Sequence, residues 1–470
     1  MQIEELRSFY DKIASERRAW IAKNSYYHED IQAFASFNVL PEDSVLEIGC
    51  GPGDLVAALP CRNKTGMDLS ENMLKLAREK YPSCEFMQAD AGDLPAGRTY
   101  DKVILSDTIG LLPDVQAAFE SLQRVTSPTS RVLITYYNYL WEPFLKMAEQ
   151  WGLKMPQPVQ NWLPLDDIEN LLTLAGFEVI RKGHRLLFPF KIPYVSTFFN
   201  RILARLPFIN RLALVQWVIA KPMTHKIDAS ETTVSVMIPC RNELENIEPA
   251  ILRTPMMGKD TELIFVDGSS TDGTVEKINE MIRKYPEKKI RLVHQGAARG
   301  KNDATRKGFD AANGDVLMIL DADLTVPPKD LPKFFRALTE GRGEFINGTR
   351  LVYPMEKEAM RFLNLLGNKF FGMAFSYLLD QRFTDTLCGT KVLWRKSYEK
   401  IKAGRAYFGE FDPFGDFDLL FGAAKQNLKI IELPIRYRER TYGVTKIRRF
   451  FHGWLLLKMC AVAMRKIKFV

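Results

Sequence analysis

The sequence predicts an α/β protein with two domains in one chain. In both halves, short apolar segments typical of strands alternate with helical segments, a pattern that favours largely parallel sheets. Glycine or acidic residues directly follow several of these strands, at the edge where open α/β sheets bind ligands. A length of 470 residues allows two or three domains with separate cores, and 46% hydrophobic with 26% charged residues is ordinary globular composition.

We divide the chain into four segments. Residues 1–182 form the first domain, and residues 183–231 form a helical connector and linker of basic and apolar residues. Residues 232–450 form the second domain, and residues 451–470 form a C-terminal helix of similar basic and apolar character.

The first strand of the first domain leads into a glycine-rich turn. Residues 44–48, which include Glu47, read as a strand, and Gly49, Gly51 and Gly53 lead from it into a helix. Glycines lack side chains, so a ligand can approach the turn and the first amides of the helix. The glycines alone are weak evidence for a ligand site, because tight turns also use glycine.

Acidic residues end the next two strands, Asp68 the second and Asp90 the third, and residues 100–107 form a fourth strand. A carboxylate at position 68 can accept hydrogen bonds from both hydroxyls of a ribose. With these motifs in this order, residues 25–182 resemble class I S-adenosylmethionine-dependent methyltransferases. The resemblance implies a Rossmann-like fold whose cofactor-binding residues are Glu47, Gly49, Gly51 and Gly53 in the first motif, Asp68 at the ribose and Asp90 at the adenine.

Two questions about the first domain stay open. A nicotinamide-dependent oxidoreductase is the competing use of such glycines, but the spacing here is Gly-x-Gly-x-Gly rather than Gly-x-Gly-x-x-Gly. The methyl acceptor is not indicated, because Tyr136, Tyr137, Asn138 and Trp141 suit an acceptor pocket and core packing equally. The domain therefore transfers methyl groups, or it binds the cofactor or a docking partner without catalysis.

The connector mixes basic and apolar side chains, and residues 183–222 contain no acidic residue. This mixture suits a helix that lies in a membrane interface. A helical extension packed on the first sheet, with its arginines reaching water, explains it equally well.

The second domain is organised around two carboxylates at the end of a strand. Residues 316–320 are an unbroken apolar run, typical of a strand buried on both faces, and Asp321 and Asp323 follow it. Both carboxylates can reach the crevice at the carboxyl edge of the sheet, where hard oxygen ligands suit Mg²⁺ or Mn²⁺ carrying a diphosphate. A lone Asp-x-Asp is more often an acidic turn, so the interpretation depends on the preceding motifs.

Those motifs come in a recognisable order. Pro239 ends one strand and Glu243 follows it, Asp267 ends the next strand, and Lys301 opens the helix before the acidic strand. In sequence and order, residues 232–450 resemble the inverting family 2 glycosyltransferases of the GT-A fold.

The resemblance implies roles for these residues at a nucleotide sugar. Pro239 and Glu243 would border the nucleoside, Asp267 would contact the base, and Lys301 would belong to the same site. Asp321 and Asp323 would hold the metal and the diphosphate, whose growing charge on departure a divalent metal neutralises.

Two later stretches point to a subgroup of this family. Residues 347–350 read Asn-Gly-Thr-Arg, and residues 385–391 read Asp-Thr-Leu-Cys-Gly-Thr-Lys. Both resemble dolichyl-phosphate mannose and glucose synthases and their bacterial polyprenyl-phosphate relatives. The resemblance implies a lipid phosphate acceptor, which the cations of Arg350 and Arg361 would guide.

The acceptor decides whether catalysis needs a base. A lipid phosphate is already anionic near neutral pH and attacks the sugar carbon without one. A saccharide hydroxyl, the alternative acceptor, requires Asp416 or Asp418 to take its proton. Asp418 is explained equally well as a carboxylate at a helix N-terminus.

The basic charge is concentrated in the second half of the chain. The formal net charge is +8, and the residues after 222 hold 41 of the 65 basic and 31 of the 57 acidic side chains. This balance suits anionic substrates or an anionic membrane surface. Nucleic acid is not expected, because the aromatic residues there alternate with apolar residues and form no basic stacking surface.

The remaining features favour a cytoplasmic protein bound peripherally to the membrane. Six scattered cysteines fit a reducing compartment, and the acidic first residues do not resemble a signal peptide. No apolar run reaches the roughly 20 residues of a spanning helix. Residues 451–470 suit an interfacial helix that delivers a lipid acceptor, or a helix docked on its own domain.

Overall fold

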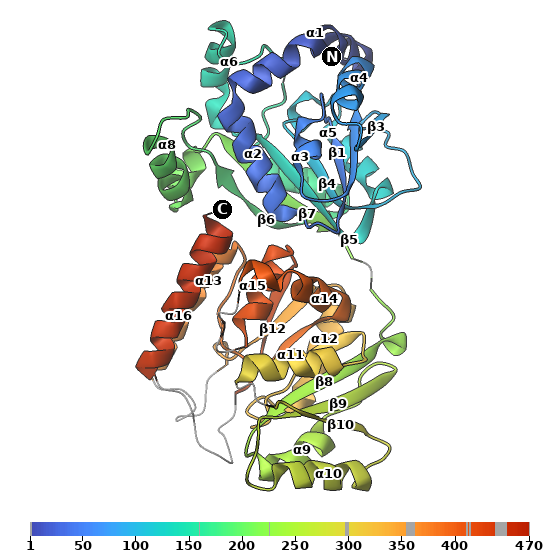
Figure 1. The fold of residues 1–470 in the computed structure, drawn as a ribbon, viewed down its shortest axis with the longest axis vertical. Coiled ribbons are helices and arrows are strands. Elements are labelled where there is room, and N and C mark those ends of the chain that lie inside the picture. The colour runs from blue at the N-terminus through green and yellow to red at the C-terminus, as the bar shows by residue number, and fades with distance from the viewer. Residues whose placement is uncertain are drawn as a thin grey trace. The chain divides into compact units, whose positions relative to one another are not determined.

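The structure is a computed structural model that describes residues 2–158, 160–224, 226–296, 300–353, 362–409, 412, 415–437 and 449–469, apart from the side chains of 362–365 and 449–450. It divides into two compact units, Met1–Met223 with Phe469–Val470, and Thr224–Lys468 (Figure 1). Each unit contains one seven-stranded sheet with helices around it. The prediction of two α/β domains is confirmed.

The sheet of the first unit has the order β3-β2-β1-β4-β5-β7-β6. Its first five strands are parallel, and β7 runs antiparallel to both of its neighbours. The strands are β1 (Ser44–Ile48), β2 (Asn63–Asp68), β3 (Glu85–Gln88), β4 (Tyr100–Ser106), β5 (Thr126–Tyr137), β6 (Phe177–Arg185) and β7 (Val215–Pro222). The helices are α1 (Ile3–Lys23), α2 (Ser25–Asn38), α3 (Asp54–Ala58), α4 (Glu71–Lys80), α5 (Val115–Ser121), α6 (Glu142–Gln150), α7 (Leu165–Leu174) and α8 (Val195–Thr197).

The structure corrects the predicted connector. The boundary at residue 182 falls inside β6, and β7 completes the first sheet, so the first unit continues to Met223. All eight residues of β7 are buried, and a short apolar run of this kind cannot be distinguished from a buried helix by periodicity. Between these strands, residues 186–214 include a continuous helical stretch from Val195 to Arg205 and a short helical turn at Ile209–Leu212.

The sheet of the second unit has the order β10-β9-β8-β11-β13-β12-β14. Strands β10, β9, β8 and β11 are parallel, whereas β13 runs antiparallel between β11 and β12. The strands are β8 (Thr233–Cys240), β9 (Asp260–Asp267), β10 (Lys289–His294), β11 (Val316–Ile319), β12 (Phe345–Thr349), β13 (Lys391–Trp394) and β14 (Ile430–Pro434). The helices are α9 (Leu244–Arg253), α10 (Thr274–Lys284), α11 (Lys301–Ala311), α12 (Leu331–Thr339), α13 (Phe362–Leu379), α14 (Arg395–Ala403), α15 (Phe417–Lys425) and α16 (Arg449–Ala463).

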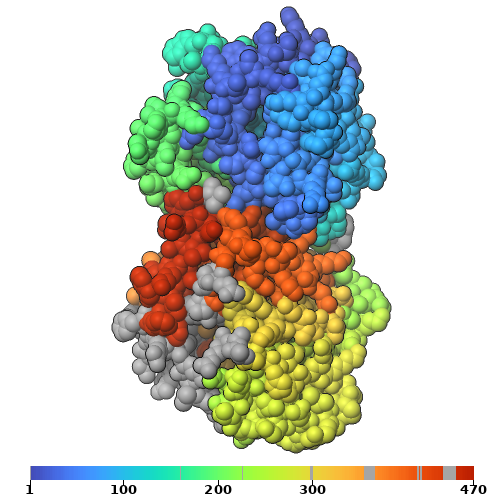
Figure 2. Space-filling view, in the orientation of Figure 1, coloured from blue at the N-terminus to red at the C-terminus, as the bar shows by residue number. Residues whose placement is uncertain are grey.

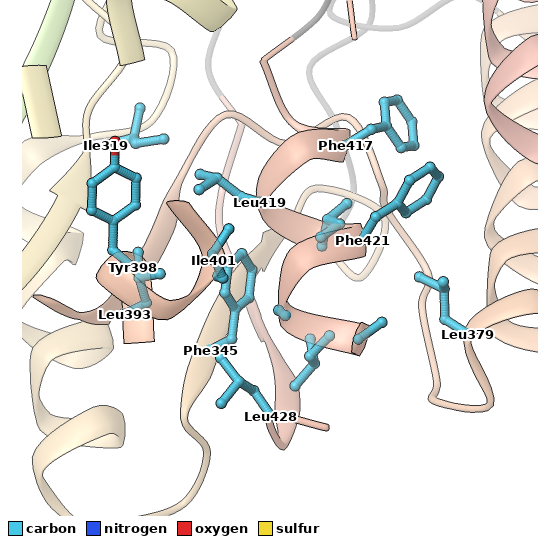
Figure 3. Packing of buried hydrophobic residues seen from close by; sticks show 14 of the residues in the cluster. Ile319, Phe345, Leu379, Leu393, Tyr398, Ile401, Phe417, Leu419, Phe421 and Leu428 are labelled. Carbon is cyan, nitrogen blue, oxygen red and sulfur yellow. The ribbon is translucent and has the colours of Figure 1, made fainter. Parts of the chain in front are cut away.

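Aromatic side chains hold the helices of the second unit against its sheet (Figure 3). Phe417 and Phe421 of α15 lie with their ring centroids 5.0 and 6.0 Å from that of Phe375 on α13. On the neighbouring helices, Tyr398 of α14 packs edge-on against Phe309 of α11 at 5.1 Å. This packing fixes the helices that carry the charged residues of the site.

The C-terminal helix docks on its own unit with one face. Leu456 and Met459 of α16 are buried in the core that α13 and α15 share, as docking predicts. Its other face exposes Phe451 and Trp454, each by 57%. Among the described residues, no helix is both long and apolar enough to cross a membrane.

Gly308 lets α11 approach β8 and β9 closely. A Cβ at this position would clash with Met237 Cγ of β8 and lie 3.0 Å from Val266 Cγ2 of β9. We expect Gly308→Ala to lower the free energy of unfolding by about 1–3 kcal/mol, measured by urea denaturation, because the core must shift to admit the methyl group. In Gly453→Ala the new Cβ meets nothing within 4 Å, so stability should not fall. Equal stability of the two variants would contradict this packing argument.

Candidate functional site

A cavity of about 860 Å³ in the first unit contains most of the predicted cofactor residues. Glu47, Gly49, Gly51, Asp68 and Asp90 line it, at the carboxyl ends of β1, β2 and β3. Gly53 does not line it and instead caps α3 with φ +80°, a conformation that favours glycine. The structure therefore brings five of the six residues to one cavity.

Asp68 is held by backbone amides at the end of β2. Its Oδ2 accepts a hydrogen bond of 2.7 Å from Gly51 N, and its Oδ1 accepts one of 2.9 Å from Ser70 N. Burial raises the pKa of Asp68, although these amides and Arg17 act against the increase. A carboxylate has about four lone-pair sites, so two amide bonds leave capacity for hydroxyl donors.

Glu47 and Asp90 also bond to the backbone. Glu47 Oε2 accepts a hydrogen bond of 2.9 Å from Val56 N in α3, and its burial raises its pKa well above the usual range. Asp90 Oδ1 accepts one of 2.9 Å from Gly92 N. Both carboxylates shape the turns that border the cavity.

A tyrosine–aspartate pair lies in the same cavity. The Tyr27 hydroxyl lies 2.7 and 2.8 Å from the two carboxylate oxygens of Asp107, a residue with φ +56° just after β4. Burial raises the pKa of Asp107 to about 6, while the Tyr27 hydrogen bond and the cations of Arg17 and Lys154 oppose the increase. A buried carboxyl that titrates near neutral pH suits proton transfer.

Of the four residues considered for an acceptor pocket, Tyr137 lines the cavity. The others are used in packing: Tyr136 is fully buried with its hydroxyl on Asn161 O, Asn138 Nδ2 donates to Arg211 O, and Trp141 Nε1 donates to Leu212 O. Of these four residues, only Tyr137 therefore lines the cavity.

In the second unit, the predicted nucleoside residues follow β8 and β9. Pro239 lies in β8 near its carboxyl end, and Glu243 is the residue directly before α9. Glu243 Oε2 accepts a hydrogen bond of 2.7 Å from the side chain of Asn246. Asp267 ends β9, and its carboxylate accepts from Ser269 N and Ser270 N at 3.1 and 3.2 Å. Because β8 and β9 are parallel neighbours, these residues share one edge of the sheet.

Asp321 forms an ion pair with Lys301 at that edge of the sheet. Lys301 Nζ lies 2.7 Å from Asp321 Oδ1. Burial alone would raise the pKa of Asp321, but Lys301, Lys391 and Arg350 outweigh it and hold the pKa below the usual value. A Cβ on Gly389 would clash with Asp321 Oδ2, so only glycine fits beside this pair.

Two more ion pairs are buried in the unit. Arg350 binds both oxygens of Asp385 with its Nε and Nη2, at 2.6 and 2.8 Å. Lys391 Nζ lies 3.0 Å from Asp416 Oδ1. The guanidinium of Arg350 is therefore already bound to a carboxylate, and Arg361 lies outside the described residues.

The surroundings of Asp418 do not favour the predicted base. Its buried carboxylate oxygen Oδ2 lies 3.2 Å from Arg306 Nε and 2.8 Å from Arg405 Nε. Both guanidinium groups lie against this one oxygen, so a hydroxyl acceptor would have to compete with two cations for it. Asp418 lies in the first turn of α15, as the structural interpretation predicted.

Comparisons with known proteins match the two halves separately. The family described as glycosyl transferase family 2 matches residues 235–402, and the family described as methyltransferase domain matches residues 16–182. The chain joins a methyltransferase domain to a family 2 glycosyltransferase domain. Both sequence resemblances are thereby confirmed.

Two curated relatives match the glycosyltransferase domain. Dolichol-phosphate mannosyltransferase of Pyrococcus furiosus is 31% identical over 220 residues, which are 46% of this chain and 59% of the relative. Undecaprenyl-phosphate 4-deoxy-4-formamido-L-arabinose transferase of Enterobacter sp. (strain 638) is 34% identical over 220 residues, 45% of this chain and 62% of the relative. The chain therefore spans about three fifths of the length of these relatives.

Among solved structures, glucosyl-3-phosphoglycerate synthase from Mycobacterium tuberculosis is 17% identical with a TM-score of 0.38. The match covers 50% of this chain and 80% of that structure, which holds Mn²⁺, uridine diphosphate and glucosyl-3-phosphoglycerate.

The donor set of the glycosyltransferase domain suits a divalent cation that arrives with its substrate. Asp321 and Asp323 supply carboxylate oxygens, and Asp323 Oδ1 accepts from Thr325 N and Oγ1 at 3.1 and 2.8 Å. Among the described residues, no group of three or more His, Cys, Asp or Glu side chains is arranged to hold a metal. Two carboxylates fit Mg²⁺ or Mn²⁺ when a diphosphate completes the coordination.

The methyltransferase domain likewise fits S-adenosylmethionine. A Cβ at Gly51, where φ is +52°, would meet nothing within 4 Å, so the cavity is open beside this turn. Asp68 stands next to that opening with acceptor capacity for a ribose.

Sequence reasoning missed Tyr27, Asp107, Lys391 and Asp385 as members of these sites. Tyr27 lies in a helix 80 residues before Asp107, and Asp385 is 35 residues from Arg350. Such pairs carry no periodic signal. Asp107 ends the predicted strand 100–107, and Asp385 and Lys391 lie in the motif at residues 385–391, so the sequence marked these positions but not their partners.

Replacement of Asp107 tests its burial. The pKa of this carboxyl rises from 3.8 to about 6 on folding, so above pH 6 the folded state bears a desolvated charge, and below pH 4 both states are protonated. We expect Asp107→Asn to raise the free energy of unfolding at pH 8 by about 1–3 kcal/mol, a gain that shrinks from pH 6 to pH 4. Urea denaturation across this range measures it. Asp167→Asn, at an exposed position of α7, is the control, and an equal gain at every pH would contradict the assignment.

Proposed function

We propose that the glycosyltransferase domain transfers a sugar from a nucleotide sugar to a polyprenyl phosphate, with Mg²⁺ or Mn²⁺. The observation that carries the proposal is that both carboxylates available as bases are engaged by cations. Asp418 is bound by two arginines, and Asp416 is paired with Lys391. A phosphate acceptor needs no base, whereas a saccharide hydroxyl does.

The charges around Asp321 support an anionic donor. Lys301, Lys391 and Arg350 all act on Asp321, so three cations lie near the carboxylates that would hold the metal. Asp321 and Asp323 would hold the divalent cation, which when bound neutralises the charge that grows on the departing diphosphate. Lys301 would contact the diphosphate, and Pro239, Glu243 and Asp267 would border the nucleoside.

The names of the relatives support a lipid acceptor. One is a dolichol-phosphate and the other an undecaprenyl-phosphate sugar transferase. We infer that Arg350, and Arg361 outside the described residues, guide the lipid phosphate. This acceptor places the protein peripherally at the cytoplasmic face of a membrane.

The methyltransferase domain is proposed to bind S-adenosylmethionine through Glu47, Gly49, Gly51, Asp68 and Asp90 and to transfer its methyl group to an acceptor in the same cavity. The alternative is a domain that binds the cofactor or docks a partner without catalysis, beside a glycosyltransferase that acts on saccharide hydroxyls in surface-polysaccharide synthesis. The Tyr27–Asp107 pair in the cavity favours catalysis, because a purely structural domain does not require a carboxyl poised to accept a proton.

A donor panel tests the glycosyltransferase. Purified protein is incubated with Mg²⁺ or Mn²⁺ and each of several nucleotide sugars, with and without a short, water-soluble polyprenyl phosphate. We expect transfer only with the lipid phosphate and loss of transfer on chelation of the metal. Donor hydrolysis with no transfer to the lipid, but transfer to saccharides, would move the function to the alternative and make Asp416 the residue to replace.

A pair of variants tests whether the two sites are separate. Asp323→Ala should reduce sugar transfer at least about a hundredfold, because one metal ligand is lost, and leave S-adenosylmethionine affinity unchanged. Asp68→Ala should do the reverse, weakening cofactor binding measured by calorimetry while sugar transfer persists. Loss of both activities in either variant would contradict the two-site assignment.

A further inference from the structure

The segment that joins β6 to β7, residues 186–214, exposes a large apolar surface on the methyltransferase domain. We call it the β6–β7 segment; it contains the helical stretch from Val195 to Arg205, which α8 begins, and the short turn at Ile209–Leu212. It forms a protruding lobe of its unit (Figure 2, green). Its exposed side chains include Phe190, Tyr194, Phe198, Ile202, Phe208 and Leu212. Exposed apolar residues gathered in this way mark an interaction site.

Two tight turns present the most exposed aromatic residues of this segment. In Pro193-Tyr194-Val195, Val195 N donates to Pro193 O at 2.7 Å, and Tyr194 has φ 63° and ψ −42°. In Pro207-Phe208-Ile209, Ile209 N donates to Pro207 O at 2.9 Å, and Phe208 has φ 70° and ψ −49°. Both are three-residue γ-turns of the strained, positive-φ type.

These two strained turns point their aromatic rings into solvent. Tyr194 is 90% exposed and Phe208 is 79% exposed. Positive φ at a bulky residue is strained and persists where the surrounding structure imposes it, and such residues cluster at functional sites. The same apolar-Pro-aromatic-apolar order, Ile-Pro-Tyr-Val and Leu-Pro-Phe-Ile, produces both turns.

Polar contacts underneath fix the segment to the domain. Asn200 accepts from Phe188 N at 2.8 Å and donates to Phe188 O at 2.7 Å, and it also donates to the Tyr26 hydroxyl of α2 at 3.1 Å. Arg185 binds both carboxylate oxygens of Asp30 at 2.6 and 2.8 Å. The surface is therefore held in place by side chains of the domain.

The charges on the segment are basic. Lys191, Arg201 and Arg211 are exposed, and no acidic residue occurs between Glu178 and Asp228. The exposed Lys191 pairs with Glu29 of α2 at 3.1 Å, and Asp166 of α7 faces Arg211. Exposed aromatic rings beside cations match an anionic bilayer, where rings sit at headgroup depth and the negative surface attracts the cations.

We propose that the β6–β7 segment is a membrane-binding surface that inserts Tyr194 and Phe208 among the headgroups of an anionic bilayer, with Arg201 and Arg211 on its phosphates. The inference rests on the proposed peripheral membrane location and assigns it to the methyltransferase domain. It is independent of the sugar and of the methyl acceptor.

Vesicle sedimentation of the full chain tests the surface. We expect the protein to bind vesicles of phosphatidylglycerol and phosphatidylcholine more tightly than vesicles of phosphatidylcholine alone. The double variant Tyr194→Ser/Phe208→Ser should lower the partition coefficient about tenfold or more. Arg201→Gln/Arg211→Gln should remove most of the preference for anionic vesicles and most of its salt dependence.

A matched control replaces exposed apolar residues elsewhere. Leu174 and Met256 are 66% and 68% exposed, and Leu174→Ser/Met256→Ser should bind vesicles as the unchanged protein does. Circular dichroism confirms that each variant is folded. Unchanged vesicle binding by Tyr194→Ser/Phe208→Ser would overturn the proposal. The proposal would also be overturned if the unchanged protein were a dimer that does not bind vesicles and this variant were a monomer.

Transfer to a water-soluble polyprenyl phosphate separates this inference from the proposed function. If transfer occurs and the chain does not bind vesicles, the surface is wrong and the function stands. If the chain binds vesicles through Tyr194 and Phe208 but transfers no sugar, the surface stands and the function is wrong.

Discussion

A buried charge must be paired, and the glycosyltransferase domain is built around that constraint. Lys301, Arg350 and Lys391 each face a carboxylate at 2.6 to 3.0 Å, because an unpaired ion in a crevice costs several kcal/mol. Each of these cations is therefore stabilised where the fold buries it.

A second electrostatic feature is the group of carboxyls that line the cavity of the methyltransferase domain. Glu47, Asp68 and Asp107 are carboxyls whose pKa values burial raises, and backbone amides or Tyr27 supply their hydrogen bonds. The cation of Arg17 also acts on Asp68 and Asp107, so the cavity combines these carboxyls with a nearby positive charge. Asp68 keeps acceptor capacity for hydroxyl donors.

The fold and the motif residues could be predicted to different depths. Two strand ends were predictable from apolar runs, because the runs before Asp267 and Asp321 stop where the chain leaves the core. Strand β7 was not, since a buried run of eight residues has the same composition as a packed helix. The occupation of Asp418 by Arg306 and Arg405 was also invisible, because those partners lie 112 and 13 residues away.

The sequence by itself determined the two α/β domains, their families and the residues placed at strand ends, because periodicity and motif spacing are local properties of the chain. The tertiary structure decided which charges meet. It joined Tyr27 to Asp107 and Arg350 to Asp385, and it turned Tyr194 and Phe208 outward on one lobe. Those outcomes depend on how helices pack on sheets and on where a desolvated charge finds its partner, and neither is encoded in spacing along the chain.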